Sequence, residues 1–248
     1  MYRQPGSAIS TRPAWRPWTS CWQTQSRSRI ACSLSTARGC YDPPVEAPDV
    51  APLPAEKNGY ITFGSANQIS KVTDEVIALW AEVMRVVPDS RLYIKTKAFK
   101  EPEVAARYMG LFGKAGIAPE RLKLEGPGSQ LDILRYYNHI DIALDTFPCA
   151  GGTTTCEALW MGVPVITLMG ERFCNRHSAS HMQNAGITDT TAESKEQYIA
   201  IVTRMAADIP SLSARRQSMR TTVAASPLCD APRFAKHFAG VLRQMWNA

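Results

Sequence analysis

The sequence of 248 residues predicts an α/β fold, a Rossmann-like doubly wound parallel sheet. From Gly59 onward, short apolar runs alternate with amphipathic stretches of about 10 to 16 residues, which is the pattern of strand–helix–strand units. The connections between these runs are short, which favours parallel strands with helices on both faces of the sheet. The composition, 45% hydrophobic and 20% charged residues, is that of a globular protein with a sizeable core.

The individual elements follow from their start and stop signals. Thr73 caps a helix with acidic residues in its first turn, and Pro88 ends it. Ser129 begins another helix through a Ser-x-x-Asp capping box. The strands are predicted at 60–63, 91–95, 121–125, 140–145 and 163–168. The helices are predicted at 73–87, 102–115, 129–139, 154–161, 175–185, 194–208 and 230–245.

Two segments precede this regular pattern. Residues 1–41 hold six arginines, no acidic residue and half of the six tryptophans, and no amphipathic period persists there. A transit peptide, a basic disordered arm and a wrong or out-of-frame start would each produce this composition, so we assign the segment no fold. Residues 42–58 contain five prolines and are expected to form an extended connector. The regular lobe then occupies 59–248.

The net charge of +6 does not indicate a nucleic-acid-binding protein. The excess lies in residues 1–41, since 42–248 hold 22 basic and 22 acidic side chains. No apolar run approaches the roughly 18 to 20 residues of a membrane span, and the mean hydropathy is −0.20. We therefore expect neither nucleic acid nor a membrane among the partners.

Seven cysteines without a Cys-x-x-Cys pair indicate neither a zinc site nor a disulfide framework. They are typical of reduced thiols in a cytoplasmic protein. His177 and His181 have the spacing of zinc ligands on one helix face, but no third ligand is in view, so we expect no metal and interpret 171–181 as solvated helix surface. Three tryptophans on apolar helix faces are expected in the core, namely Trp80, Trp160 and Trp246.

Two loops could bind a ligand, because doubly wound sheets bind ligands at the carboxyl ends of their strands. The first follows strand 60–63 and contains Asn67, Gln68 and Lys71. Gln68 could hydrogen-bond to phosphate oxygens, and Lys71 could attract them by charge. A solvated strand–helix turn is the simpler interpretation of this loop taken alone.

The second loop, which begins at Asp145, has the more specific pattern. Paired glycines ending at Gly152 let a ligand approach the backbone, and three threonines then open a helix whose free N–H groups attract an anion. A diphosphate fits such a site, and Glu157, one turn on, could accept hydrogen bonds from sugar hydroxyls. The alternative is a plain capping box, because Thr154-x-x-Glu157 satisfies that pattern.

The run IDIALDTFPCAGGTTTCEALWMGVPVITL at 140–168 resembles the C-terminal catalytic half of the O-linked N-acetylglucosamine (O-GlcNAc) transferases, including bacterial tetratricopeptide-linked and plant SPINDLY-like members. The resemblance covers about residues 40–248. It continues through Asn67-Gln68-x-x-Lys71, Arg176-x-Ser178-Ala179-Ser180, Ser226-Pro227-Leu228 and Arg243-Gln244-Met245-Trp246. It implies the C-terminal lobe of an inverting GT-B glycosyltransferase, the lobe that holds UDP-GlcNAc.

The resemblance also implies roles for individual residues. Gln68 and Lys71 would have the catalytic roles, contacting the diphosphate and stabilising charge on the leaving UDP without a metal. Glu157 would bind the ribose hydroxyls, and the uracil would lie against the 126–130 loop. No cofactor is implied besides the donor substrate UDP-GlcNAc, and the acceptor would be Ser or Thr of a protein or peptide. The other donor-binding residues would be Asn67, Gly128, Gln130, Gly152, Thr153, Thr154 and Thr155.

This sequence departs from the family in several places. Ala66 replaces a phenylalanine and Ile133 a histidine, so the family's base and phosphate contacts there are not implied. The N-terminal acceptor lobe and the tetratricopeptide array have no counterpart, so we expect a fragment that pairs with a separate lobe or self-associates. The alternatives are a non-catalytic nucleotide-sugar-binding or scaffold module and a GDP-fucose-using relative. The hypothesis of a nucleic-acid-binding protein would depend on the basic residues of 1–41 alone.

Overall fold

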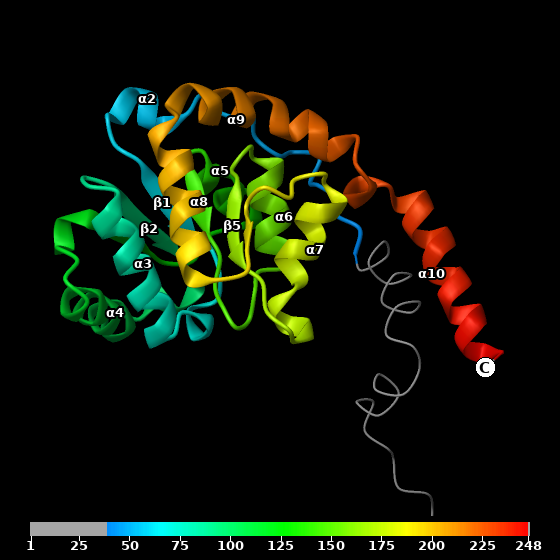
Figure 1. Ribbon diagram of the computed structural model, residues 1–248, viewed down its shortest axis with the longest axis horizontal. Helices are drawn as coiled ribbons and strands as arrows, with labels where there is room; N and C mark the ends of the chain where they lie inside the picture. Colours follow the sequence, from blue (N-terminus) through cyan, green and yellow to red (C-terminus); the bar gives the residue numbers. More distant parts are fainter. Residues whose placement is uncertain (1–38, 248) are drawn as a thin grey trace, which may run out of the picture. The chain divides into compact units, whose positions relative to one another are not determined.

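The computed structural model describes residues 39–247, which are built around one parallel sheet. Its strands lie in the order β3-β2-β1-β4-β5-β6. This is the order of a doubly wound sheet, so the predicted fold class is confirmed. Of these strands, β1, β2 and β5 are labelled in Figure 1. The predicted segment 1–41 lies outside the described residues except for its last three. The strands are β1 Thr62–Ser65, β2 Arg91–Lys95, β3 Leu122–Glu125, β4 Ile142–Leu144, β5 Val165–Leu168 and β6 Thr191–Ala192.

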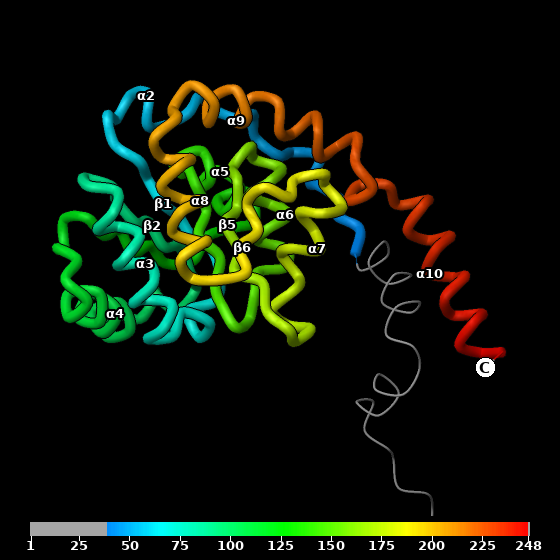
Figure 2. The backbone as a smooth tube through the Cα atoms, viewed as in Figure 1, coloured from blue at the N-terminus to red at the C-terminus, as the bar shows by residue number. Residues whose placement is uncertain are grey.

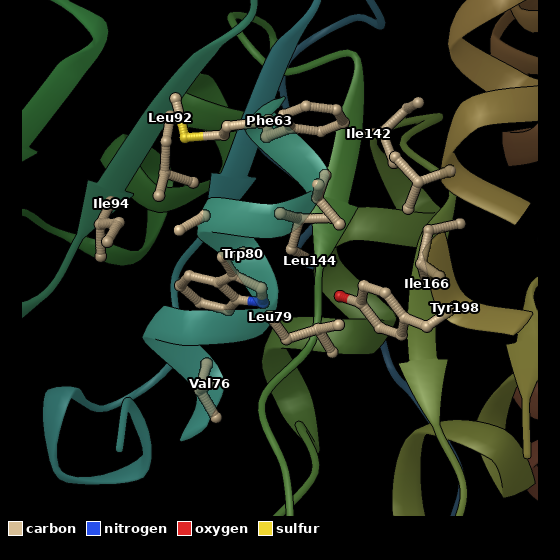
Figure 3. Close-up of a cluster of buried hydrophobic side chains, with 14 of the residues drawn as sticks. Phe63, Val76, Leu79, Trp80, Leu92, Ile94, Ile142, Leu144, Ile166 and Tyr198 are labelled. Atoms are coloured by element: carbon tan, nitrogen blue, oxygen red, sulfur yellow. The ribbon is translucent and has the colours of Figure 1, made fainter. Parts of the chain in front are cut away.

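Helices cover both faces of the sheet. The first core contains residues of α3 Asp74–Val86, α4 Pro102–Lys114 and α8 Lys195–Ala207. The second contains residues of α5 Gln130–Tyr137, α6 Thr153–Trp160 and α7 His177–Asn184. Successive strand residues point to opposite faces, so β2 gives Leu92 and Ile94 to the first core and Tyr93 to the second. Figure 3 shows the fully buried Trp80 of α3 within the first core.

The order of the strands reverses at β1. The chain runs from β1 to β2 and β3 through α3 and α4, and then returns through α5 to β4, on the other side of β1 (Figure 2). The predicted capping box at the start of α5 is confirmed, with the Asp132 N–H donating to Ser129 Oγ over 3.2 Å. The carboxyl ends of β1 and β4 therefore form the switch point at which doubly wound sheets bind ligands.

The predicted connector is wrong at its end, which forms the short helix α2 Pro54–Asn58. Pro54 suits the first helical position because it lacks an N–H, and Gly59, at φ 75°, ends the helix in the left-handed region. The Ala55 N–H donates to Asp141 Oδ1 over 2.8 Å, and the Thr62 N–H donates to Asp141 Oδ2 over 2.7 Å. Asp141 thus ties the end of the connector and β1 to the start of β4.

The sequence pattern does not predict α9 Ile209–Ala224, because a charged residue lies in its buried stripe. Arg216 is fully buried among Leu212, Met219 and Val223. Its guanidinium donates to three backbone carbonyls, those of Ala51 (2.7 Å), Ile140 (2.7 Å) and Tyr137 (3.1 Å). The pattern also misses β6, and β1 begins two residues later than predicted.

The last helix, α10 Ala231–Trp246, has no buried residue. Its apolar side chains Phe238, Leu242, Met245 and Trp246 are exposed, Trp246 by 90%. The prediction of a core position is therefore wrong for Trp246 and confirmed for Trp80. Trp160 is half-buried. Among the helices of residues 39–247, none is long and apolar enough to cross a membrane.

Candidate functional site

The loops that follow β1 and β4 meet at the switch point. The first holds Asn67 and continues into a 3₁₀ turn, Ile69–Lys71. Lys71 Nζ donates to the Ala150 carbonyl over 2.9 Å, and Thr154 Oγ1 donates to Asn67 Oδ1 over 3.0 Å. These partners are 79 and 87 residues apart in the sequence. The structure therefore brings the two predicted ligand loops into one site.

The helix α6 presents an uncapped N-terminus to this site. Its N-cap is Gly152, no side chain caps it, and Thr153 is its first residue. The capping-box alternative for Thr154 and Glu157 is therefore wrong. Among the described residues, the N–H groups of Gly152, Thr153 and Thr154 find no acceptor. These free donors and the helix dipole attract an anion.

The threonines that begin α6 have different surroundings. Thr153 is exposed and Thr154 is half-buried. Thr155 is buried, and its hydroxyl lies 2.8 Å from Ser178 Oγ, which also donates to the Gly151 carbonyl over 3.2 Å. Thr155 and Ser178 consequently hold the Gly151 end of the loop through buried hydrogen bonds. The sequence pattern assigns this role to neither residue.

The two glycines of the loop also differ. A Cβ on Gly151 would overlap Thr155 Oγ1 and lie 3.1 Å from Asp145 Oδ1. A Cβ on Gly152 would meet no atom within 4 Å. Packing therefore requires the first glycine, whereas the second leaves open space in front of the helix N-terminus.

Asp145, at the end of β4, organises the floor of the site. Its buried carboxylate accepts four hydrogen bonds, three on Oδ1 and one on Oδ2. Burial raises the pKa of Asp145, and hydrogen bonds to the carboxylate oppose that rise. The sequence offers one signal for it, a carboxylate directly after a buried apolar strand. The donors are Asn67 Nδ2 (3.2 Å), the Thr146 N–H (2.9 Å), the Gly151 N–H (2.8 Å) and Thr167 Oγ1 (2.7 Å).

Glu157 lies below the surface of α6. It is 6% exposed, and burial raises the pKa of its carboxyl to about 7. Among residues 39–247, no side chain or backbone N–H donates a hydrogen bond to it. Burial first, and the nearby Glu157 carboxylate second, raise the pKa of both Tyr41 and Tyr137. Glu157 is therefore a buried acceptor with phenol rings as neighbours.

The remaining predicted residues lie at the edge of the site or on a separate loop. Gln68 is exposed, and its backbone carbonyl accepts a hydrogen bond from the backbone N–H of Lys71 over 3.0 Å. Gly128 and Gln130 are exposed on the loop between β3 and α5. Beside Gly128 lies an open hollow, in which the buried Lys95 pairs with Glu125. Its other polar lining residues include Tyr93, Lys123, Asp132 and Arg135.

The sequence predicts solvated helix surface for the histidines of α7, and this prediction is wrong. His177 and His181 are half-buried, and burial lowers the pKa of His181 to about 4. In the described part of the chain, no group of three or more His, Cys, Asp or Glu side chains could hold a metal ion. The cysteines described there are unpaired, namely Cys40, Cys149, Cys156, Cys174 and Cys229.

Several known proteins are similar to this chain. The probable UDP-N-acetylglucosamine–peptide N-acetylglucosaminyltransferase SPINDLY of Solanum lycopersicum is 39% identical over 210 residues, which are 84% of this chain and 22% of that protein. The UDP-N-acetylglucosamine–peptide N-acetylglucosaminyltransferase of Caenorhabditis elegans is 25% identical over 187 residues, 75% of this chain and 16% of that protein. The chain thus spans about a fifth of the length of these relatives.

Solved structures agree with the sequence relatives. A mutant of the O-GlcNAc transferase of Thermobaculum terrenum matches with a TM-score of 0.77 at 35% identity, over 83% of this chain and 39% of that one. Sucrose-phosphate synthase of Thermosynechococcus elongatus matches with a TM-score of 0.55 at 15% identity, over 81% of this chain and 51% of that one. The match to sucrose-phosphate synthase is evidence for the fold alone.

The sheet order and these structural matches define the fold as a Rossmann-like lobe of the GT-B glycosyltransferase type. The family can be stated as well. The model of glycosyl transferase family 41 matches residues 47–238, so the chain belongs to that family. The resemblance seen in the sequence is confirmed.

Proposed function

We propose that this lobe binds UDP-GlcNAc and presents the sugar for inverting, metal-independent transfer to Ser or Thr of a protein acceptor. The observation that supports this most is the meeting of Lys71 with the uncapped end of α6. A diphosphate placed there would meet a side-chain cation and the free N–H groups of Gly152, Thr153 and Thr154. The names of the relatives favour UDP-N-acetylglucosamine as the donor.

In this proposal, the leaving UDP gains negative charge as its bond to the sugar breaks. Lys71 stabilises that charge, because an ammonium has three N–H groups and can keep one on the Ala150 carbonyl while another reaches a phosphate oxygen. The N–H groups at the start of α6 are already aimed and need no rearrangement. Gln68, exposed at the edge of the site, supplies an amide to the same phosphates.

The nucleoside would be bound by α6 and by the loop between β3 and α5. We assign the ribose hydroxyls to Glu157 and the uracil to the 126–130 loop, with Gly128 and Gln130. Because the Glu157 pKa is about 7, hydroxyl donors from a ribose would favour its ionised form near neutral pH. Lys71, Gln68 and Glu157 would then bind successive parts of one donor molecule.

The acceptor and the partner lobe are also proposals. The chain spans 39% of the bacterial transferase chain, so most of a two-lobe enzyme lies outside the matched part. The exposed apolar face of α10, with Phe238, Leu242 and Met245, is the surface that we expect a separate lobe to cover, or a second copy in its absence. We place the protein in the cytoplasm, in agreement with the unpaired cysteines of the described residues.

Calorimetric titration of the full chain with UDP and with GDP tests donor binding. We expect UDP to bind, and Lys71→Ala to weaken it at least about tenfold, because a charge-assisted hydrogen bond contributes about 1.5 to 3 kcal/mol. Lys114→Ala, which removes an exposed lysine of α4, is the matched control and should bind UDP like the unmodified chain.

The other outcomes separate the alternatives. A preference for GDP would change the donor to a GDP-sugar such as GDP-fucose. Binding of UDP without sugar transfer to a protein acceptor would favour a nucleotide-sugar-binding module that needs another lobe. Binding of neither nucleotide would refute the proposed donor site and favour a scaffold.

A further inference from the structure

The hydrogen bonds that lead away from Asp145 have one consistent direction. Asp145 Oδ1 accepts from the backbone N–H groups of Thr146 and Gly151, which can only donate, so the Asn67 atom that lies 3.2 Å from the same oxygen is the amide nitrogen. The amide oxygen of Asn67 then faces Thr154 Oγ1, 3.0 Å away. An amide oxygen only accepts, so the Thr154 hydroxyl is the donor. Because a hydroxyl has one proton, Thr154 has none left for a ligand.

The neighbouring threonine is placed differently. Thr153 is exposed, and no described residue makes a hydrogen bond with its hydroxyl. Thr154, in contrast, is held at two points, because its carbonyl also accepts from the Tyr137 hydroxyl over 2.8 Å. Of these two adjacent hydroxyls at the helix start, only that of Thr153 keeps a proton free for a phosphate oxygen.

We propose that Asp145 is a positioning residue that acts through Asn67 to commit the Thr154 hydroxyl proton to the protein. The donor diphosphate is then bound by the backbone N–H groups of the α6 N-terminus and by the Thr153 hydroxyl. This inference rests on the proposed function, and it divides a run of similar residues into a ligand contact, Thr153, and a supporting residue, Thr154.

The same carboxylate explains why the site is formed before a ligand arrives. Asp145 Oδ1 accepts from the Gly151 N–H over 2.8 Å as well as from Asn67, so one atom holds both ligand loops. Thr167 of β5 donates to the other oxygen over 2.7 Å and fixes the plane of the carboxylate. Donors that are held in this way require no rearrangement when an anion binds.

A double-mutant cycle on the full chain tests the inference. UDP affinity is measured by calorimetry for Thr154→Val, Asn67→Ala and the double variant. We expect Thr154→Val to weaken UDP binding several-fold alone and to have less than about a twofold effect when Asn67 is already Ala, because its hydroxyl acts through Asn67. The matched comparison, Thr153→Val, should weaken binding about tenfold in both backgrounds.

Three further variants separate positioning from stability. Ser90→Ala removes hydrogen bonds with the Val87 carbonyl and with Arg121, outside the site, so it should lower the melting temperature and leave UDP affinity unchanged. Asp145→Asn can keep an acceptor oxygen towards Asn67 and should retain more UDP affinity than Asp145→Leu, which cannot.

The outcome that overturns the inference is an equal loss of UDP affinity from Thr154→Val in both backgrounds, since that would mean direct contact between Thr154 and the diphosphate. If the unmodified chain does not bind UDP, the proposed function fails instead. The cycle is then measured as the free energy of unfolding, where additive effects of Asn67→Ala and Thr154→Val would contradict the hydrogen-bonded link itself.

Discussion

The burial of Glu157 leads to a quantitative prediction for the stability of the fold. Its carboxyl has a pKa of about 7 in the folded chain, raised by burial from an ordinary value of 4.5. The folded state therefore binds this proton more tightly than the unfolded state. Its contribution to stability is full below about pH 4.5 and is lost as the pH rises to about 7. Glu157→Gln has a similar shape and cannot ionise, so it should escape this loss.

The size of the effect follows from the two pKa values. A pKa difference of about 2.5 corresponds to about 3.4 kcal/mol, at about 1.36 kcal/mol for each pKa unit. Of this, about 2.5 kcal/mol falls between about pH 5 and about pH 8. We therefore expect Glu157→Gln to gain about 2.5 kcal/mol in free energy of unfolding, relative to the unmodified chain, over that interval.

Urea unfolding at a series of pH values measures this difference. Burial raises the pKa of Asp141 to about 6 and lowers the pKa of His181 from 6.5 to about 4, so both groups also change the stability within part of this interval, but their effects are common to both proteins and cancel. Glu82→Gln, which removes an exposed carboxylate of α3, is the control, and a change with pH as large as that of Glu157→Gln would contradict the assignment to Glu157. A pH-independent difference for Glu157→Gln would refute the reasoning.

Two other predictions use matched pairs of variants. Gly151→Ala should lower the free energy of unfolding by about 1 to 3 kcal/mol, because the new Cβ overlaps Thr155 Oγ1. Gly152→Ala, whose Cβ meets no atom within 4 Å, should be less costly in the same denaturant titration, and equal costs would contradict the packing argument. On α10, Leu242→Glu should reduce self-association of the full chain in sedimentation experiments, because it places a charge on the exposed apolar face. Gln244→Glu is its control, and an unchanged sedimentation profile for Leu242→Glu would exclude this face as the contact.

Most of the fold could be predicted because its signals are local. Thr73 and Ser129 cap their helices through hydrogen bonds within one turn, and each buried strand is a short apolar run. The sequence could not predict α9 because its buried stripe includes Arg216, whose acceptors are distant backbone carbonyls. It did not predict α2 because that helix has only five residues and lies in a proline-rich run, and its Ala55 N–H donates to Asp141, 86 residues away.

The same distinction applies to the site. The glycine–threonine loop is predictable because its glycines and its helix start are consecutive in the sequence, whereas the different roles of Thr153 and Thr154 depend on Asn67, 87 residues from Thr154.

Two aspartates that bracket β4 suggest how such links could be found. Asp141, just before the strand, accepts from the Ala55 and Thr62 N–H groups, and Asp145, just after it, accepts from Asn67 and Gly151. Both carboxylates are buried at the ends of this fully buried strand, and burial requires that each find several donors. At the amino end of β4 those donors belong to the scaffold. At the carboxyl end they belong to the ligand loops, because that is where the loops of a doubly wound sheet converge. An acidic residue directly after a central apolar strand is therefore a candidate organiser of the site, even when its partners cannot be named from the sequence.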